Sequence, residues 1–261
     1  MADHPNPHLA RISHKHSSRF GQTVLPDDQS GRTVYEKCGL VEAGDSLQLI
    51  IREQSSLSYT LQEGSTLELI HTGSADIKVT LHARSHLKTF YVGTEGERRE
   101  CRYHITLAGE EARASLLGLS MVKGTQAAHI HVEVIHQKPH TYSEQCFKSV
   151  VADSGRVEFT GLIHLCPEAQ KSSAEQKSKS LLLSDKARVH TKPQLQIYAD
   201  DVKATHGATV GHLDETELFY LQSRGFSLEE ARKLLVHAFI KELIEKIPVS
   251  SIQQESYAIT Y

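Results

Sequence analysis

The chain has 261 residues, enough to bury a substantial core, and its 29 Lys and Arg against 32 Asp and Glu give a net charge of −3. That balance offers no general attraction to phosphate, so we do not expect nucleic-acid binding. Hydrophobic residues make up 39% of the chain and Trp is absent, which is typical of narrow, solvent-facing strands.

The cysteines Cys38, Cys101, Cys146 and Cys166 are widely separated and form no C-x-x-C pair. This spacing argues against a zinc knuckle or a self-contained four-cysteine cluster, and it favours isolated, reduced thiols in a cytoplasmic protein. The first residues lack the apolar segment of a signal peptide, and no apolar run is long enough to span a bilayer. We therefore expect a cytoplasmic protein without membrane contact.

Residues 1–43 are polar, with four histidines among Pro, Ser and Asn, and we expect a partly disordered lead-in. From Gly44 to residue 212, apolar and polar residues alternate in short runs separated by glycine turns. Period-two alternation indicates strands with one buried face, and a strand about every ten residues is typical of a sandwich, a barrel or a β-helix. No amphipathic helix interrupts this region, which argues against α/β architectures.

Two stretches of this region need separate interpretation. In His129–His136 (HIHVEVIH), alternation leaves His129, His131 and Glu133 on one face, which suggests either a metal site or, as we favour, the polar face of an ordinary strand. Residues 167–179 (PEAQKSSAEQKSK) contain almost no large apolar groups, so we predict a solvated excursion there.

Helix signals begin at Leu213. Asp214 with Glu217, and Ser227 with Glu230, have capping-box spacing, while Gly225 suits the end of a first helix and Pro248 the end of a second. We predict a helical hairpin over 213–247, followed by a loosely held tail over 248–261.

The residues around this strand-to-helix transition resemble those of the SufB/SufD family of iron–sulfur cluster assembly proteins, and the SufD branch in particular. The matching residues are Lys192-Pro193, Asp200-Asp201-Val202-Lys203, His206-Gly207-Ala208-Thr209-Val210-Gly211, Leu213-Asp214-Glu215, Leu218-Phe219-Tyr220-Leu221 and Ser223-Arg224-Gly225. The resemblance extends more weakly back to about Ala108. It implies a right-handed parallel β-helix over 44–212 followed by the helical hairpin.

The same resemblance implies a non-catalytic scaffold subunit that pairs with a SufB-like subunit and docks a SufC-like ATPase through its C-terminal helices. His206 is then a candidate iron ligand, shared with the partner around a transient iron–sulfur cluster that the isolated chain does not hold, because one imidazole cannot hold a cluster. Ala204 stands where many relatives have a cysteine, so no cluster role carries over to that position. Longer relatives also have an additional N-terminal helical region.

Candidate partner-binding residues lie in the hairpin. Residues 218–221 (LFYL) are all bulky, and successive helical side chains turn by about 100°, so some must point away from the chain's own core. We expect Phe219, Tyr220, Arg224 and Phe239 to contact the ATPase. If both phenylalanines were buried, the hairpin would be only a cap.

Two other functional classes remain open. One is a β-helix polysaccharide-active enzyme using acidic residues such as Asp200 and Asp201, although adjacent residues on a strand point to opposite faces. The other is a structural homo-oligomer, since a β-helix with an unpaired end also favours a homodimer. No phosphate-binding G-x-x-x-x-G-K-[ST] loop occurs, so any ATP hydrolysis would belong to a partner.

Overall fold

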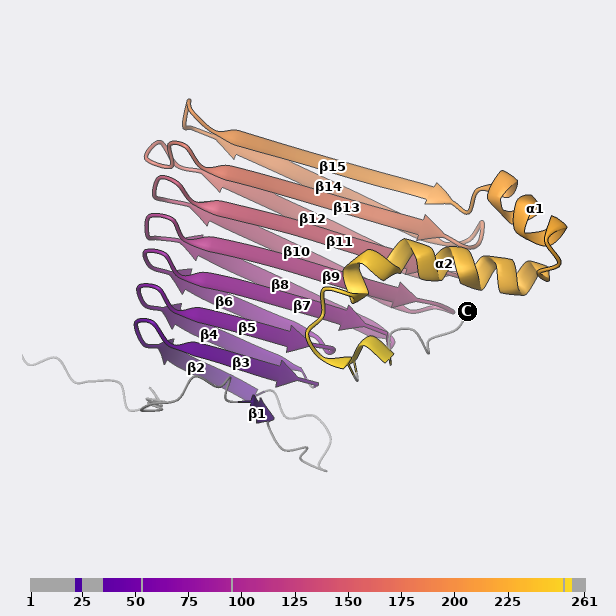
Figure 1. The fold of residues 1–261 in the computed structure, drawn as a ribbon, viewed down its shortest axis with the longest axis horizontal. Helices are drawn as coiled ribbons and strands as arrows, with labels where there is room; N and C mark the ends of the chain where they lie inside the picture. Colours follow the sequence, from indigo (N-terminus) through magenta and orange to yellow (C-terminus); the bar gives the residue numbers. More distant parts are fainter. Residues whose placement is uncertain (1–21, 25–34, 53, 95, 251, 255–261) are drawn as a thin grey trace, which may run out of the picture.

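The structure is a computed structural model that describes residues 22–24, 35–52, 54–94, 96–250 and 252–254. Within these residues the chain forms strands and then two helices (Figure 1). The strands are β1 (Gln22–Val24), β2 (Tyr35–Val41), β3 (Ser46–Ile51), β4 (Ser55–Leu61), β5 (Thr66–His71), β6 (Ala75–Leu81), β7 (His86–Gly93), β8 (Arg98–Leu107), β9 (Arg113–Val122), β10 (Ala127–His136), β11 (Tyr142–Val151), β12 (Arg156–Leu165), β13 (Ser173–Leu182), β14 (Arg188–Ile197) and β15 (Lys203–His212). The helices are α1 (Glu215–Ser223) and α2 (Leu228–Ile244).

Successive strands alternate between two sheets, so the chain winds as a parallel β-solenoid. The odd-numbered strands form one sheet in the order β1-β3-β5-β7-β9-β11-β13-β15, and the even-numbered strands form the other from β2 to β14. Each strand pairs in parallel with the strand two positions away in the chain. We call the two layers the odd sheet and the even sheet. The expected parallel β-helix with C-terminal helices is confirmed.

One corner of the coil repeats a turn with a residue in the left-handed conformation. These residues are Gly44, Gly64, Arg84, Glu111, His140 and Lys171. A buried hydroxyl often follows them and holds the turn: Ser65 Oγ donates to the carbonyl of Gln62 at 2.7 Å. Left-handed backbone is costly for residues other than glycine, so these hydrogen bonds help the corner to form.

The interior changes character along the solenoid. Between the early strands it is an apolar cluster that includes Leu57, Leu67, Ile77 and Tyr103, all almost fully buried. Between the late strands of the odd sheet, the inward side chains become polar: Ser143 and Gln145 on β11, and Gln176, Ser178 and Ser180 on β13, are buried. The alternation of inward and outward side chains therefore continues along these strands, while the inward groups change from hydrocarbon to hydroxyl and amide.

The predicted solvated excursion over 167–179 is wrong from Ser173 onward, because β13 begins there. Small or polar side chains, Ala174, Gln176 and Ser178, face inward, while charged groups such as Glu175 and Lys177 face outward. A strand with a polar interior lacks the large apolar residues on which the prediction depended. Its period-two alternation was the signal that could have revealed it.

Part of the outer face of the odd sheet is covered by α2, which lies in front of the strands in Figure 1. Val236, Ile240, Leu243 and Ile244 of α2 pack with apolar residues on the sheet's outer face, such as Leu119. Residues after the helix, including Ile247 and Ile252, extend this contact toward the earlier strands. α2 therefore covers a side of the solenoid and leaves its C-terminal end uncovered.

Most of the expected lead-in over 1–43 lies outside the described residues. The part that is described contains β1 and β2, so strands begin before Gly44. Most of the tail over 248–261 likewise lies outside the described residues. Where the structure describes the chain, neither helix has the length and apolar character needed to cross a membrane.

Candidate functional site

The last coil of the solenoid is an open end. Among the described residues, β14 pairs only with β12, and β15 pairs only with β13, so both strands are sheet edges of ten residues each. Figure 1 shows them at the top of the stack. Nearly all of β15 is exposed, and so is much of β14. Long edge strands are templates for pairing with another chain.

The direction of the free backbone groups follows from the existing hydrogen bonds. Lys203 N donates to Ser172 O, so odd-numbered residues of β15 face β13, and even-numbered residues present their N–H and C=O to the open edge. On β14 the even-numbered residues face β12, since Arg188 N donates to Gly155 O, and the odd-numbered residues point to the open edge. Pro193 therefore occupies an open-edge position of β14 and has no N–H to offer. β15 has no proline and presents the continuous edge.

His206 lies on β15 and is exposed. Its register partner on β13 is Gln176, whose side chain is inside the solenoid. Ala204, two residues earlier on the same face, packs against an interior cluster. The imidazole of His206 therefore belongs to the inner face of the terminal coil, which is accessible only because no further coil covers it.

A column of buried amides leads from the interior to His206. Gln145 on β11, Gln176 on β13 and His206 on β15 occupy one register position on three successive strands. Gln176 Nε2 donates to Gln145 Oε1 at 2.6 Å, and both glutamine side chains are fully buried. Among the described residues, Gln176 Oε1 has no hydrogen-bond partner, and neither has Gln145 Nε2. Gly161 on β12 leaves room for this amide, since a Cβ there would lie 2.2 Å from Gln176 Nε2.

The two helices begin where the sequence predicts. The side chain of Asp214 accepts hydrogen bonds from the backbone N–H groups of Thr216 and Glu217, and this lowers the pKa of its carboxyl group. Ser227 and Glu230 form the full capping box of α2. In Figure 1, α1 and the start of α2 project past the strand ends at the side of the solenoid.

The candidate partner-binding residues separate into two groups. Phe219 and Tyr220 are 73% and 56% exposed, and the Arg224 guanidinium lies 5.1 Å from the centre of the Tyr220 ring. Phe239 instead packs against the cluster under α2, with Lys148 Nζ 5.3 Å from its ring centre. The expected exposure of an aromatic side chain is thus found at Phe219, and Phe239 is largely internal to the fold.

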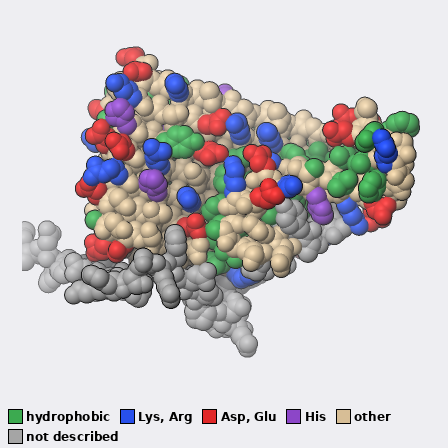
Figure 2. Space-filling model, in the orientation of Figure 1, with side chains coloured by type: hydrophobic (Ala, Val, Ile, Leu, Met, Phe, Trp, Pro, Cys, Tyr) green, Lys and Arg blue, Asp and Glu red, His purple; other side chains and the backbone are tan. Residues whose placement is uncertain are grey.

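Three further exposed apolar residues of the hairpin were not among the expected partner-binding residues. Phe226, Leu228 and Leu234 are 44%, 42% and 44% exposed. Together with Phe219 and Tyr220 they form what we call the hairpin patch, and Figure 2 shows hydrophobic side chains gathered over this projecting part of the molecule. The sequence signal was the position of Phe226 and Leu228 on either side of the N-cap Ser227, where a helix start often remains solvent-exposed.

Comparison with known proteins identifies the family. A family model described as "SUF system FeS cluster assembly, SufBD core domain" matches residues 19–239. The chain belongs to the SufBD family. It is 38% identical to the iron–sulfur cluster assembly protein SufD of Escherichia coli over 152 residues, which cover 58% of this chain and 36% of that protein. It is 31% identical to a SufBD family iron–sulfur cluster assembly protein of Synechocystis over 206 residues, which cover 79% of this chain and 45% of that one.

The chain is 33% identical to the iron–sulfur cluster assembly protein SufD of Bacillus subtilis over 137 residues, which cover 52% of this chain and 31% of that protein. This SufBD chain therefore spans about half or less of the length of the curated relatives it matches, from 31% to 54%. The matched residues contain the solenoid and most of the helical hairpin, so the open end and the hairpin patch both lie in the family's core region.

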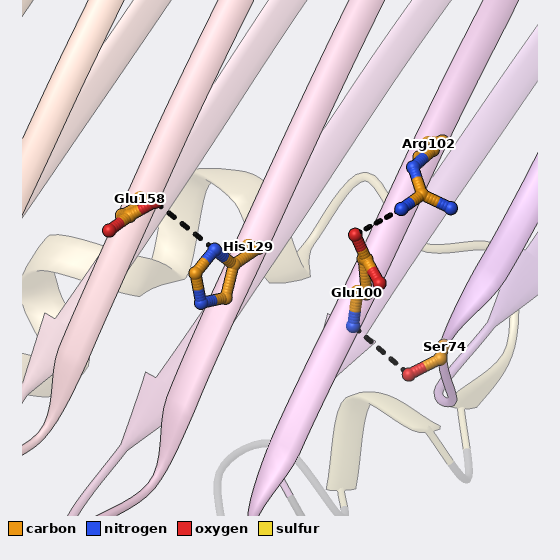
Figure 3. A network of polar contacts seen from close by, with 5 residues as sticks. All are labelled: Ser74, Glu100, Arg102, His129 and Glu158. Atoms are coloured by element: carbon orange, nitrogen blue, oxygen red, sulfur yellow. Dashed lines mark hydrogen bonds and ion pairs between the residues drawn. The ribbon is translucent and has the colours of Figure 1, made fainter.

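The histidine-rich stretch of this SufBD core forms part of β10 and makes histidine–glutamate contacts with neighbouring strands. His129, His131 and Glu133 lie on the outer face of β10, and their charged neighbours are on adjacent strands. His129 Nδ1 lies 3.1 Å from Glu158 Oε2 (Figure 3), and His104 Nδ1 lies 3.0 Å from Glu133 Oε2. No group of three or more His, Cys, Asp or Glu side chains able to hold a metal ion occurs within the described residues.

The cysteines of the SufBD chain do not gather at the open end. They are free thiols on different strands or turns, and Cys101 is buried inside the solenoid. Burial raises the pKa of Cys101 to about 11, and burial also raises the pKa values of Cys146 and Cys166. These three thiols therefore remain protonated at neutral pH and are poor nucleophiles and metal ligands in this state.

Asp200 and Asp201 lie in the turn between β14 and β15, and both are exposed. The backbone N–H of Asp201 donates a hydrogen bond of 2.9 Å to Gln170 Oε1. Two neighbouring carboxylates in one exposed turn differ from the arrangement of glycosidases, where the carboxyl groups flank a substrate from opposite sides. The structure therefore gives no support to the polysaccharide-active alternative.

Proposed function

We propose that this chain is a non-catalytic scaffold subunit of a Suf iron–sulfur cluster assembly complex. In this proposal, the open end of the solenoid pairs with a SufB-like subunit, and the hairpin patch docks a SufC-like ATPase. The iron–sulfur cluster is cargo that is held briefly between subunits. We place the complex in the cytoplasm, where thiols remain reduced.

The observation that carries the proposal is the edge of β15 with His206 on its inner face. Ten residues of edge strand with free backbone groups provide a pairing surface, and His206 lies within it. A neutral imidazole is a suitable ligand for iron, and mixed ligation by histidine and cysteine is known chemistry. Because the described residues contain no group of three or more possible metal ligands, the ligands that complete the site would come from the partner.

The hairpin patch supports the second contact. Its two aromatic residues on α1 stand beside Arg224, and aromatic and arginine side chains are the types most enriched in binding hot spots. The patch belongs to the part of the hairpin that projects from the solenoid, whereas the rest of α2 is fixed to the odd sheet. One rigid body would therefore present two separate surfaces to two partners.

Co-expression of this chain with the SufB-like and SufC-like subunits tests the proposal. Size-exclusion chromatography under anaerobic conditions should give one complex of the three proteins, and iron and sulfide analysis should detect an assembled cluster. His206→Ala should leave the complex and the thermal transition of the chain unchanged, because the side chain is exposed and contributes little packing. Cluster content should fall at least tenfold.

Two controls complete this experiment. The chain reconstituted alone with iron and sulfide should not form a stoichiometric cluster, since one imidazole is too few ligands. A stable cluster on the isolated His206→Ala chain would contradict the shared site. Unchanged cluster content in the His206→Ala complex would show that His206 has no role as a ligand, and an unfolded variant would make the residue structural.

A structural homo-oligomer is the second candidate, because the same open edge can accept another copy of this chain. Size-exclusion chromatography of the chain with and without the SufB-like subunit separates the two. A homodimer that persists in the presence of the SufB-like subunit favours the homo-oligomer, and replacement by a heterodimer favours the scaffold role.

A further inference from the structure

The buried amide of Gln176 lies one strand behind His206, at the same register position. Parallel strands are about 4.8 Å apart, so side chains on one face at paired positions are neighbours. Gln176 is fully buried, yet its Oε1 has no hydrogen-bond partner in the described part of the chain. Buried acceptors in native proteins are nearly always paired, so an orphaned one next to an exposed histidine needs an explanation.

The other polar atom of this amide, Nε2, already forms a hydrogen bond. Gln176 Nε2 donates to Gln145 Oε1 at 2.6 Å, and among the described residues Gln176 Oε1 and Gln145 Nε2 are the two atoms of this pair without a hydrogen-bond partner. The space around the pair is open to movement of the imidazole, because the flanking inward residues on β15 are Ala204 and Ala208. Along the column, the residue next to this acceptor on the following strand is His206.

We propose that Gln176 is a positioning residue for His206: its Oε1 accepts a hydrogen bond from one ring N–H when a partner covers the open end. The other ring nitrogen is then unprotonated and is presented toward the partner. Histidines that ligate metals commonly donate their second ring nitrogen to a carbonyl or carboxylate, which sets the tautomer and the ring orientation. The inference rests on the proposed role of His206 and adds the residue that orients it.

Gln145 provides a matched control for a purely structural role. It is equally buried, carries the same amide, and forms the same hydrogen bond from the other side, but it is one strand further from His206. If the two amides serve only to fill the interior, Gln145→Leu and Gln176→Leu should act alike. If Gln176 orients His206, only Gln176→Leu should change the state of the imidazole.

The test uses the chain labelled with nitrogen-15 histidine and purified in the co-expressed complex, without added iron. Solid-state NMR distinguishes protonated from unprotonated ring nitrogens, and His206→Gln assigns the signals of His206. We expect a single tautomer of His206 in the parent and in Gln145→Leu, and a mixture of two tautomers in Gln176→Leu. In a separate sample given iron and sulfide under anaerobic conditions, the iron bound per complex should fall at least tenfold in Gln176→Leu and less than twofold in Gln145→Leu.

Several results would overturn the proposal. These are a tautomer mixture in the parent complex, a single tautomer retained in Gln176→Leu, or equal effects of the two leucine substitutions. Gln176→Met removes the same acceptor with an unbranched side chain, so it replaces Gln176→Leu if that variant does not fold, and the parent spectrum requires no variant at all. If His206→Ala leaves cluster content unchanged, the proposed ligand role fails, while the tautomer spectra still decide whether the hydrogen bond exists.

Discussion

Lys148 Nζ donates a hydrogen bond of 2.7 Å to the backbone carbonyl oxygen of Phe239, and so joins the odd sheet to α2. The lysine is almost fully buried beneath the helix, and its ammonium group also lies 3.3 Å from Glu242 Oε2. The hydrogen bond from Lys148 lowers the pKa of Glu242. A buried charge is held here by two oxygen atoms and the face of an aromatic ring, which fixes where the helix lies on the sheet.

Lys148→Met should loosen α2 while leaving the solenoid folded. Methionine replaces the stem of the lysine but removes its charge-assisted hydrogen bond, which is typically worth about 1.5–3 kcal/mol. Urea denaturation should show a loss of about 2 kcal/mol, and amide hydrogen exchange should accelerate in α2 more than in β9 or β11.

Lys179→Met is the matched control. Lys179 is the register partner of Lys148 on β13, on the same outer face, but its side chain is exposed. Its replacement should change the free energy of unfolding by less than about 0.5 kcal/mol. Equal effects of the two substitutions would show that Lys148 does not fix the helix.

Two buried histidines predict sensitivity to acid. His136 lies between Thr141 Oγ1 and Ser143 Oγ, each at 2.8 Å, and His71 Nε2 lies 2.6 Å from the Tyr103 hydroxyl. Burial lowers the pKa of each imidazole from 6.5 to about 4. Both histidines are therefore neutral in the folded protein at pH 7.

Because the folded-state pKa lies below the unfolded value, the stability that these histidines contribute is fully present above pH 6.5. It is lost as the pH falls from 6.5 toward 4, by up to about 3 kcal/mol for each group. Urea denaturation at pH 7.5, 6.0, 5.0 and 4.5 should show this decline. His136→Gln should lower stability at pH 7.5 but decline less steeply toward pH 4.5, and a slope equal to that of the parent would contradict the assignment.

The solenoid could be predicted from the sequence, because its signal is local. Alternation in segments such as Ile77 to Leu81 fixes which side chains face inward, and the turn residues fix where strands end. Alternation does not specify which strand pairs with which, since a sandwich and a solenoid bury the same faces. That choice came from the resemblance carried by the residues around His206.

The interior of the late coils could not be predicted in the same way. Gln176 lies in a stretch without large apolar residues, and polar composition alone indicates solvent exposure. Its burial follows from its place in the solenoid, because β13 pairs with β11 on one side and with β15 on the other. Likewise, Phe219 and Phe239 have similar helical surroundings in the sequence, and only the placement of α2 on the odd sheet makes one exposed and the other internal.

Pairing through the edge of β15 predicts a specific effect of proline. The N–H of Ala208 points to the open edge, because the N–H groups that face β13 belong to the odd-numbered residues. Ala208→Pro therefore deletes one edge donor and keeps the existing ladder, as Pro193 does on β14. We expect at least a tenfold weaker association with the SufB-like subunit, measured by analytical ultracentrifugation, with a thermal transition within a few degrees of the parent.

Thr209→Pro is the comparison for this variant. The N–H of Thr209 faces β13, so its loss breaks the ladder inside the chain and should lower the thermal transition of the chain by itself. Undiminished association of Ala208→Pro would show that the partner does not continue the sheet at β15.

The last prediction concerns the hairpin patch as the docking surface for the ATPase. Phe219 is 73% exposed on α1, so Phe219→Asp removes little packing and should keep the thermal transition within a few degrees of the parent. A charge at the centre of an apolar interface is costly to desolvate, so binding to the SufC-like ATPase, measured by isothermal titration calorimetry, should weaken at least 30-fold. Phe219→Tyr keeps the ring and should bind within threefold of the parent. Phe239→Ala supplies the opposite case: its ring packs beneath α2 beside Lys148 but is only partly buried, so the variant should lose stability, by less than the ~3–5 kcal/mol typical of a fully buried ring. If Phe219→Asp binds the ATPase as tightly as the parent does, the exposed aromatic residues are not a docking surface and the partner must contact another face.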